Sequence, residues 1–335
     1  MKIIRLPGTD PYLNLALEEH FLRSGGDDDY LLLWRNDNTI VVGLHQNTGE
    51  EINSAFVEER GIRVARRRTG GGAVYHDLGN LNFSFITKAT EASRLTMERF
   101  TLPVVRALAE MGLWAEASGR NDILAEGRKV SGNAQTLHKQ RILHHGTLLF
   151  NSDLSVLSQA LRVRPEKFLS KSVKSVRARV GNIAELLPER LRSMSIEEFG
   201  ERVALAFSRA GGTETLALAP DDLAAAEALA DEKYRTWEWN FGRSPKFTFR
   251  NQEKFTGGFL EVWLDVRQGV IEDCGFYGDF MALRPASEVA LRLRGLRYER
   301  EAAAAALDDL PRSGLVLAEY FGGIGRDEIL RCMFG

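Results

Sequence analysis

Residues 121–150 read NDILAEGRKVSGNAQTLHKQRILHHGTLLF and decide the fold class of the chain. They contain three runs of strand length, which are 121–124, 129–135 and 142–150. Short turns at Glu126-Gly127 and Lys139-Gln140 separate these runs with the spacing of β-hairpins. Because the strands follow one another without an intervening helix, a doubly wound parallel sheet is disfavoured. We predict an α+β fold with a mixed, largely antiparallel sheet covered by helices.

A lysine and a carboxylate are expected to lie close together in the first hairpin. With a two-residue loop at Glu126-Gly127, Lys129 pairs with Leu124. Asp122 then pairs with Ser131 on the same face, which makes it the diagonal neighbour of Lys129. Such a pair can be a surface ion pair of little energetic value. Alternatively, Lys129 binds an acid while Asp122 holds a hydrated Mg²⁺ on a phosphate. The pattern leaves both interpretations open.

Two adjacent histidines, His144 and His145, lie on the third strand. Side chains alternate along a strand, so His145 and Thr147 share one face and His144 takes the other. The two imidazoles therefore cannot bind the same metal ion from this strand. A structural role is the more common one for such histidines. If Lys129 defines the face of a site, His145 is the one expected to reach it.

Upstream, residues 66–80 read RRRTGGGAVYHDLGN and join a run of arginines to a run of glycines. Glycine adopts positive φ and brings backbone N–H groups close to a ligand, while guanidinium forks bind carboxylate or phosphate oxygens at two points. Taken separately, the two halves would be a solvated face and a flexible turn. Their combination predicts an anion site. The glycine spacings of P-loops and of dinucleotide-binding folds are both absent.

Further elements are expected on both sides of these segments. Helices are predicted over 11–24, 50–59, 100–111, 223–230, 287–294 and 301–307. Strands are predicted over 30–34, 39–42, 62–68, 81–86, 260–266 and 270–276. The polar triplet 36–38 is interpreted as the turn of a hairpin between the first two of these strands. Within 62–68, alternation places Arg66 and Arg68 on one face and Arg67 on the other.

Composition restricts the class of protein. Hydrophobic residues make up 44% of the chain and charged residues 27%, the balance of a soluble globular protein. The net charge of −2 provides no basic field for binding nucleic acid. The sequence has no signal peptide and no apolar run of about 18 residues, so we expect no membrane segment. Cys274 and Cys332 lie far apart, which favours a reducing cytoplasm over a disulfide framework.

The length of 335 residues suits two domains. An aromatic segment at 233–249, interrupted by Gly242 and Pro245, marks the expected junction. We predict a catalytic domain over 1–246 and a small α+β accessory domain over 250–335. The accessory domain offers no constellation of catalytic side chains.

Four motifs together resemble the signature of the lipoate-protein ligase A family. They are Arg66–Asp77, Gly119–Asp122, Lys129–Ala134 and His144–Leu148. The resemblance continues in register from Asp10 to Gly242 and includes the accessory domain. It implies the biotin/lipoate ligase fold, which is related to class II aminoacyl-tRNA synthetases.

The resemblance also implies a reaction in two steps. Lipoate and Mg-ATP give lipoyl-AMP, and a lysine of an apo lipoyl domain then takes the lipoyl group. The acceptors would be the E2 subunits of 2-oxoacid dehydrogenases or the H protein of glycine cleavage. We expect the enzyme to act as a monomer.

Family roles can be assigned position by position. The implied ATP site contains Arg67, Gly72, Ala73, Val74, Tyr75, Asn121 and Lys129. The implied lipoate site contains Arg66, Gly70, Gly71, His145 and Lys129. Lys129 and Asp122 are the implied catalytic pair, with Asp122 as the Mg²⁺ carboxylate. The segment 169–180 matches a loop that covers the adenylate, although Gly181 stands where a polar residue is expected.

Two other functions compete with this one. Octanoyl or lipoyl transfer without ATP needs a cysteine nucleophile, and no cysteine precedes Cys274. A non-catalytic lipoate-binding protein would be expected to lack Lys129 or the glycine run, and both are present. Lipoate and octanoate both remain open as the acid, and so does the preferred acceptor.

Overall fold

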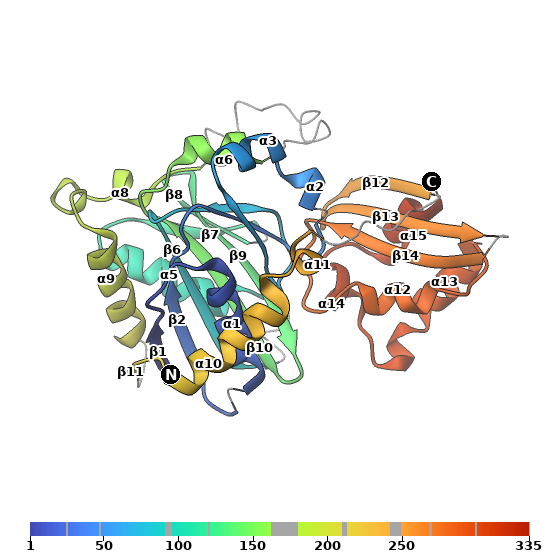
Figure 1. The fold of residues 1–335 in the computed structure, drawn as a ribbon, viewed down its shortest axis with the longest axis horizontal. Coiled ribbons are helices and arrows are strands. Elements are labelled where there is room, and N and C mark those ends of the chain that lie inside the picture. Colours follow the sequence, from blue (N-terminus) through green and yellow to red (C-terminus); the bar gives the residue numbers. More distant parts are fainter. Residues whose placement is uncertain are drawn as a thin grey trace.

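A computed structural model describes residues 1–24, 26–46, 48–90, 96–119, 121–161, 180–209, 213–241, 249–267, 270–298 and 300–334. Figure 1 shows a larger N-terminal part built around one wide sheet and a smaller C-terminal part beside it. No helix in the described part of the chain is long and apolar enough to cross a bilayer.

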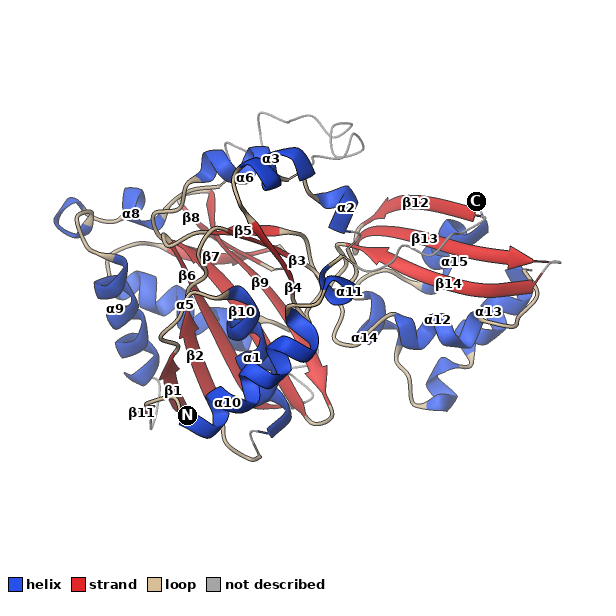
Figure 2. Ribbon diagram, viewed as in Figure 1, coloured by secondary structure: helices blue, strands red, loops and turns tan. Residues whose placement is uncertain are grey.

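The wide sheet has eight strands in the order β11-β1-β2-β6-β10-β9-β8-β7. These are β11 (Glu214–Leu216), β1 (Lys2–Arg5), β2 (Tyr30–Trp34), β6 (Asn80–Lys88), β10 (Arg141–Leu149), β9 (Arg128–His138), β8 (Asp122–Ala125) and β7 (Ala115–Ser118). The strand β1 runs parallel to β11 and β2, and the other neighbours are antiparallel. The predicted mixed, largely antiparallel α+β fold is thus confirmed (Figure 2).

The predicted meander forms as β8, β9 and β10. Its turns place Glu126 and Lys139 at φ of 49° and 53°, the left-handed conformation that tight hairpins require. Lys129 pairs with Leu124 as predicted, but Asp122 lies opposite Gly132 and not Ser131. A shift of register after Ile123 causes this one-residue difference.

The predicted hairpin between β2 and β3 (Thr39–Val42) is wrong. Strand β2 joins the wide sheet, whereas β3 pairs with β4 (Arg63–Arg66) and β5 (Val74–His76) in a separate sheet of three strands. The physical reason is the linker, because Asn36 is fully buried and bonds to Asn14 and His76. The chain therefore crosses between the two sheets through a buried polar contact.

Helices cover the two faces of the wide sheet. On one face, α5 (Glu98–Glu110) and α9 (Ile196–Arg209) bury a core that includes Leu31, Leu33 and Phe83. On the other, α1 (Pro11–Ser24) and α10 (Pro220–Leu229) pack over Leu32 and Trp34. The three-stranded sheet is backed by α3 (Ser54–Glu59) and α6 (Leu154–Ala160), with short helices α2 (Thr48–Glu51), α8 (Ile183–Leu186) and α11 (Trp237–Asn240) in the connections.

The C-terminal part has a sheet and a core of its own. The antiparallel strands are β12 (Phe249–Phe255), β13 (Gly258–Arg267) and β14 (Val270–Gly278). The helices are α12 (Ser287–Leu293), α13 (Arg300–Asp308), α14 (Leu317–Phe321) and α15 (Arg326–Phe334). It touches the N-terminal part through Leu283, whose carbonyl accepts from Leu137 N and Thr136 Oγ1, each at 2.7 Å. The ring of Phe280 also stacks on His45.

A buried carboxylate ties the first helix to distant segments. Glu19 on α1 is fully buried and bonds to Arg68 at 2.6 Å, to Lys233 at 2.6 Å and to the hydroxyl of Tyr234. Arg23 completes the cluster. Burial alone would raise the pKa of Glu19, but Arg68 and Lys233 outweigh it and lower the pKa below its ordinary value. The charged form therefore stabilises the fold.

We expect Glu19→Gln to lower the free energy of unfolding by about 3 kcal/mol at pH 7, because it leaves two partly buried cations, Arg68 and Lys233, without their counter-ion. The lowered folded-state pKa means that this stabilisation is complete above about pH 4.5 and is lost as the pH falls through the folded-state value. Urea denaturation of wild type and variant measures the difference, which should shrink between pH 7 and pH 4. Glu201→Gln, in an exposed pair with Arg5, is the control and should change little. A difference that stayed constant with pH would contradict the charge argument.

Candidate active site

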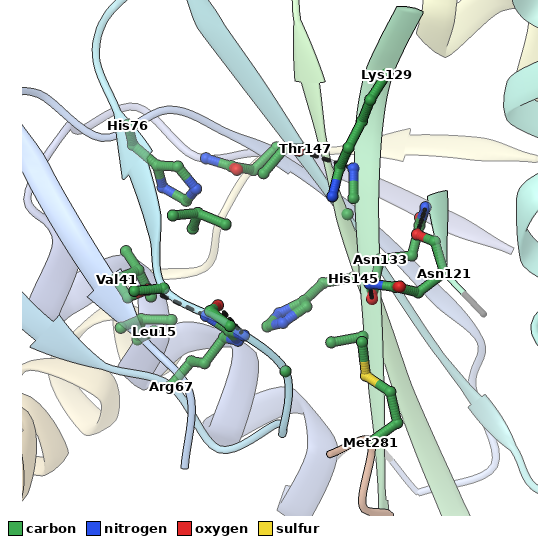
Figure 3. A pocket seen from close by; sticks show the side chains of 18 of the residues that line it. Leu15, Val41, Arg67, His76, Asn121, Lys129, Asn133, His145, Thr147 and Met281 are labelled. Atoms are coloured by element: carbon green, nitrogen blue, oxygen red, sulfur yellow. Dashed lines mark hydrogen bonds between the residues drawn. The ribbon is translucent and has the colours of Figure 1, made fainter. Parts of the chain in front are cut away.

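A cavity of about 120 Å³ lies between the wide sheet and the three-stranded sheet. Figure 3 shows Leu15, Val41, Arg67 and His76 on one side of it, and Lys129 on the other. The predicted site residues that line it are Arg67, Gly71, Gly72, Ala73, Val74, Asn121, Lys129 and His145. The two sequence motifs quoted above, which are far apart along the chain, thus form one site.

Lys129 projects from β9 into this cavity. Its Nζ lies 2.7 Å from Oδ1 of Asp122, and both side chains are about one third exposed. The proximity of these two groups is as predicted. A β-carbon on Gly132 would lie only 3.2 Å from Nζ and Cε of Lys129, so the glycine leaves room for the amine. Gly181 N–H donates to Lys129 O at 3.0 Å and fixes the backbone from the other side.

A row of residues crosses five neighbouring strands on the cavity face of the wide sheet. Trp34 on β2 pairs with Asn82 on β6, and Asn82 pairs with Thr147 on β10. The hydroxyl of Thr147 accepts from Gly132 N–H on β9 at 3.1 Å. Gly132 in turn lies opposite Asp122 on β8. This transverse row runs from an aromatic side chain to the charged pair, so the cavity is apolar at one end and ionic at the other.

Arg67 shapes the glycine loop, residues 70–72, from within. Its guanidinium donates to the carbonyls of Val41, Gly70 and Gly72, and Nε donates to Thr69 Oγ1. Burial lowers the pKa of Arg67 to about 10, so these acceptors stabilise a cation that has lost its water. Most of its donors are therefore used to hold the loop in shape.

Arg66 does not line the cavity. Its guanidinium donates to the backbone carbonyls of Gly43, Gln46 and Trp239 and to the hydroxyl of Thr48. Burial also lowers its pKa to about 10. The sequence alone favoured a ligand contact, but the structure gives these N–H groups to the backbone.

Three other predicted residues also lie outside the lining, and one of them is Asp122, which pairs with Lys129. The expected β-carbon position of Gly70 is 2.5 Å from Phe280 O, so this residue packs against the C-terminal part. Tyr75 faces the core behind the small sheet, and its hydroxyl donates to Asn38. Of the predicted covering loop 169–180, only Val180 lies within the described residues, where it forms a bridge to Lys129.

His145 is held at both ring nitrogens. Nδ1 lies 2.8 Å from Glu18 Oε1, and Nε2 lies 2.8 Å from Thr69 Oγ1. Thr69 also accepts from Arg67, so the acid, the imidazole and the guanidinium form one chain. His144 points to the other face as predicted, where it stacks on Phe100 and burial lowers its pKa to about 3.

No site role was predicted from the sequence for several other lining residues, namely Trp34, His76, Asn82, Asn133, Thr147 and Met281. Asn133 links β9 to Asn121, whose carbonyl accepts from both its backbone and its side-chain nitrogen. Met281 comes from the C-terminal part, next to Phe280, whose carbonyl accepts from Gly71 N–H at 3.3 Å. A signal was available for Asn82, because residues 80–85 alternate polar and apolar side chains, and the structure buries both faces of this strand.

Comparison with known proteins assigns the family. Residues 10–208 match the model of the lipoyl protein ligase A/B catalytic domain, and residues 244–333 match that of the bacterial lipoate protein ligase C-terminus. A lipoate-protein ligase of Bacillus subtilis is 42% identical over 97% of this chain and 97% of its own. The chain belongs to the lipoate-protein ligase family. Lipoate-protein ligase 1 of Staphylococcus aureus is 43% identical over the same shares.

Solved structures of lipoate ligases have the same fold. LipL1 of P. falciparum in complex with lipoate superimposes with a TM-score of 0.76 at 26% identity, covering 92% of this chain and 95% of that one. A lipoate-protein ligase A bound with ATP gives a TM-score of 0.61 at 30% identity. The match covers 72% of this chain and 98% of that one. The names of these structures give lipoate and ATP as ligands of the relatives.

One position tests how tightly the glycine loop of this ligase must be held. A β-carbon on Gly43 would collide with the backbone oxygen of Gly71 and approach the guanidinium of Arg67. We expect Gly43→Ala to displace the loop and to weaken ATP binding by about tenfold or more, as isothermal titration calorimetry would show. Gly8→Ala is the control, because nothing lies within 4 Å of its β-carbon position. Wild-type affinity in Gly43→Ala would contradict this role of the loop.

Proposed function

We propose that this chain is an ATP-dependent lipoate-protein ligase that converts lipoate and ATP to lipoyl-AMP and pyrophosphate. It then transfers the lipoyl group to a lysine of an apo lipoyl domain. The observation that carries the proposal is the position of Lys129, which faces the glycine loop across one cavity with an apolar far end. An acid with an apolar tail and a nucleotide would meet at this amine.

The chemistry requires a cation at that point. A carboxylate is a poor electrophile until one of its oxygens becomes a good leaving group, and activation brings it against a negatively charged α-phosphate. Lys129 can donate to both anions and stabilise the charge that develops between them. Asn121 and the N–H groups of 71–74 are the proposed contacts of the nucleotide, and His145 is the proposed wall of the acyl pocket.

The carboxylate of Asp122, beside Lys129, fits Mg²⁺ bound through a nucleotide. No group of three or more His, Cys, Asp and Glu side chains in the described residues can form a protein-only metal site. A single carboxylate together with phosphate oxygens is a common arrangement for Mg²⁺, and Asp122 would supply that carboxylate. When bound, the ion would neutralise phosphate charge. In this structure Asp122 pairs with Lys129 and orients its amine.

The proposed acceptors are apo lipoyl domains of E2 subunits or the H protein. A structural relative is described as an archaeal bipartite lipoate protein ligase with its E2 lipoyl domain, at 33% identity and a TM-score of 0.64. We further propose that the chain acts as a cytoplasmic monomer, with a catalytic domain over 1–246 and an accessory domain over 250–335. The separate sheet and core of the C-terminal part support that division.

Acyl transfer through a cysteine is disfavoured by the positions of the two thiols. Cys274 and Cys332 are both buried in the core of the C-terminal part. Burial raises the pKa of Cys274 well above its ordinary value and that of Cys332 to about 12, so neither supplies a thiolate at neutral pH. Neither lines the cavity.

Lys129→Met should fold normally yet form lipoyl-AMP at least about 100-fold more slowly, the usual effect of removing one preorganised donor to a developing charge. Mass spectrometry of the adenylate measures this directly. The matched control is Lys88→Met, which removes an exposed lysine from the end of β6. Near-normal adenylate formation by Lys129→Met would show that this lysine is not the activating cation.

The double variant Cys274→Ser, Cys332→Ser should retain ATP-dependent ligation, because the activated acyl group is held as an anhydride with AMP. Thermal denaturation will report any change in stability from these buried positions. The wild type should also accumulate bound lipoyl-AMP when no acceptor is present. A protein-bound thioester, with activity that needs no ATP and is lost in the double variant, would favour acyl transfer.

A further inference from the structure

The end of the cavity away from Lys129 contains two polar side chains with unused hydrogen-bonding groups. His76 on β5 and Asn82 on β6 are 3% and 1% exposed and both line the cavity. Within the described residues, Nε2 of His76 and Nδ2 of Asn82 have no hydrogen-bond partner. Burying such a group unpaired costs free energy, so the ligand is expected to supply a partner. The other lining histidine, His145, has both ring nitrogens occupied.

The tautomer of His76 follows from a relay of amides. Asn14 Nδ2 donates to the backbone carbonyl of Arg35 at 2.8 Å, and this orients the Asn14 amide. The same nitrogen donates to Asn36 Oδ1 at 3.0 Å, which turns Nδ2 of Asn36 toward Nδ1 of His76 at 3.1 Å. Nδ1 is therefore an acceptor, and the proton lies on Nε2. Burial, with Arg67 and His145 nearby, lowers the pKa of His76 to about 3 and keeps the ring neutral.

His76 and Asn82 lie about as far from Lys129 as the two ends of an eight-carbon acid lie from each other. Lys129 Nζ lies against Gly132 on β9, and Asn82 is two strands away in the transverse row. Two strand spacings amount to roughly 10 Å, comparable with an extended chain of that length. A carboxylate at Lys129 thus brings the far end of its chain to Asn82 and His76. Trp34 borders the same end, with its ring next to that of His76.

We propose that His76 is a specificity-determining residue, which donates Nε2–H to a sulfur atom of the dithiolane ring of lipoate and so favours lipoate over octanoate. Asn82 contributes the second polar group to the same end of the pocket. The inference rests on the proposed function and adds the preferred acid. An alkyl tail offers no acceptor and leaves the buried N–H unpaired, whereas sulfur is a weak acceptor. A site built to hydrogen-bond its substrate discriminates against an analogue that lacks the partner.

Calorimetric titration of the full chain with lipoate and with octanoate tests the proposal through the ratio of the two dissociation constants. Wild type should bind lipoate more tightly by roughly five- to tenfold, the contribution of about one net hydrogen bond. His76→Phe keeps the size of the ring but removes the N–H, so the ratio should fall to about one. His76→Gln offers an amide N–H at similar reach and should restore part of it. A defect in folding alone would weaken both acids equally.

Asn82→Leu provides an independent variant and should also lower the ratio. Nitrogen-15 NMR of the histidines should show His76 with a protonated Nε2 and an unprotonated Nδ1 between pH 5 and pH 8. Equal affinity for the two acids in wild type, an unchanged ratio in His76→Phe, or a proton on Nδ1 would overturn the inference. Adenylate formation is measured in parallel, because its absence with both acids would contradict the proposed function. The ratio of the two dissociation constants tests the role of His76 separately.

Discussion

The burial of two guanidinium groups is the constraint on which the rest of the site depends. Arg66 and Arg67 are 7% and 6% exposed and must find acceptors inside the protein. They donate hydrogen bonds to backbone carbonyls of the strand β3, of the segment after it and of the glycine loop. Arg66 Nε also donates to the carbonyl of Trp239, so the segment before the C-terminal part is tied to the same point. Arg67 thereby fixes the glycine loop and Arg66 fixes the segment after β3, which leaves ligand charge to Lys129.

The wide sheet carries the side chains of the site in one row across neighbouring strands. On the cavity face, neighbouring strands carry Trp34, Asn82, Thr147 and then Gly132 beside the amine of Lys129. Helix α1 covers the adjacent part of this face, and the small sheet encloses what remains. An acid laid along the row meets a cation at its carboxylate and aromatic and polar side chains at its tail. The same strands that form the core therefore also set the length of the pocket.

Local signals in the sequence predicted part of this arrangement. Turns at Glu126-Gly127 and Lys139-Gln140 are encoded by adjacent residues, so the meander and the proximity of Lys129 to Asp122 could be foreseen. The prediction of a β2–β3 hairpin was wrong because Asn36 bonds to Asn14 and His76, which are distant from it in the sequence. The contacts of Arg66 could not be foreseen for the same reason, since most of its acceptors are backbone carbonyls that no sequence pattern displays. Polar residues such as Asn82 gain meaning only when the facing sheet is known.

Lys129 is proposed to bind the reacting anions, while Arg67 holds the glycine loop and Arg66 holds the segment after β3. A crystal structure with a non-hydrolysable analogue of lipoyl-AMP tests it most directly. Nζ of Lys129 is expected to contact both the acyl oxygen and the α-phosphate. Arg66 should keep its bonds to Gly43 O and Gln46 O, and Arg67 its bond to Gly72 O. A structure in which Arg66 turns to the ligand while Lys129 stays paired only with Asp122 would contradict it.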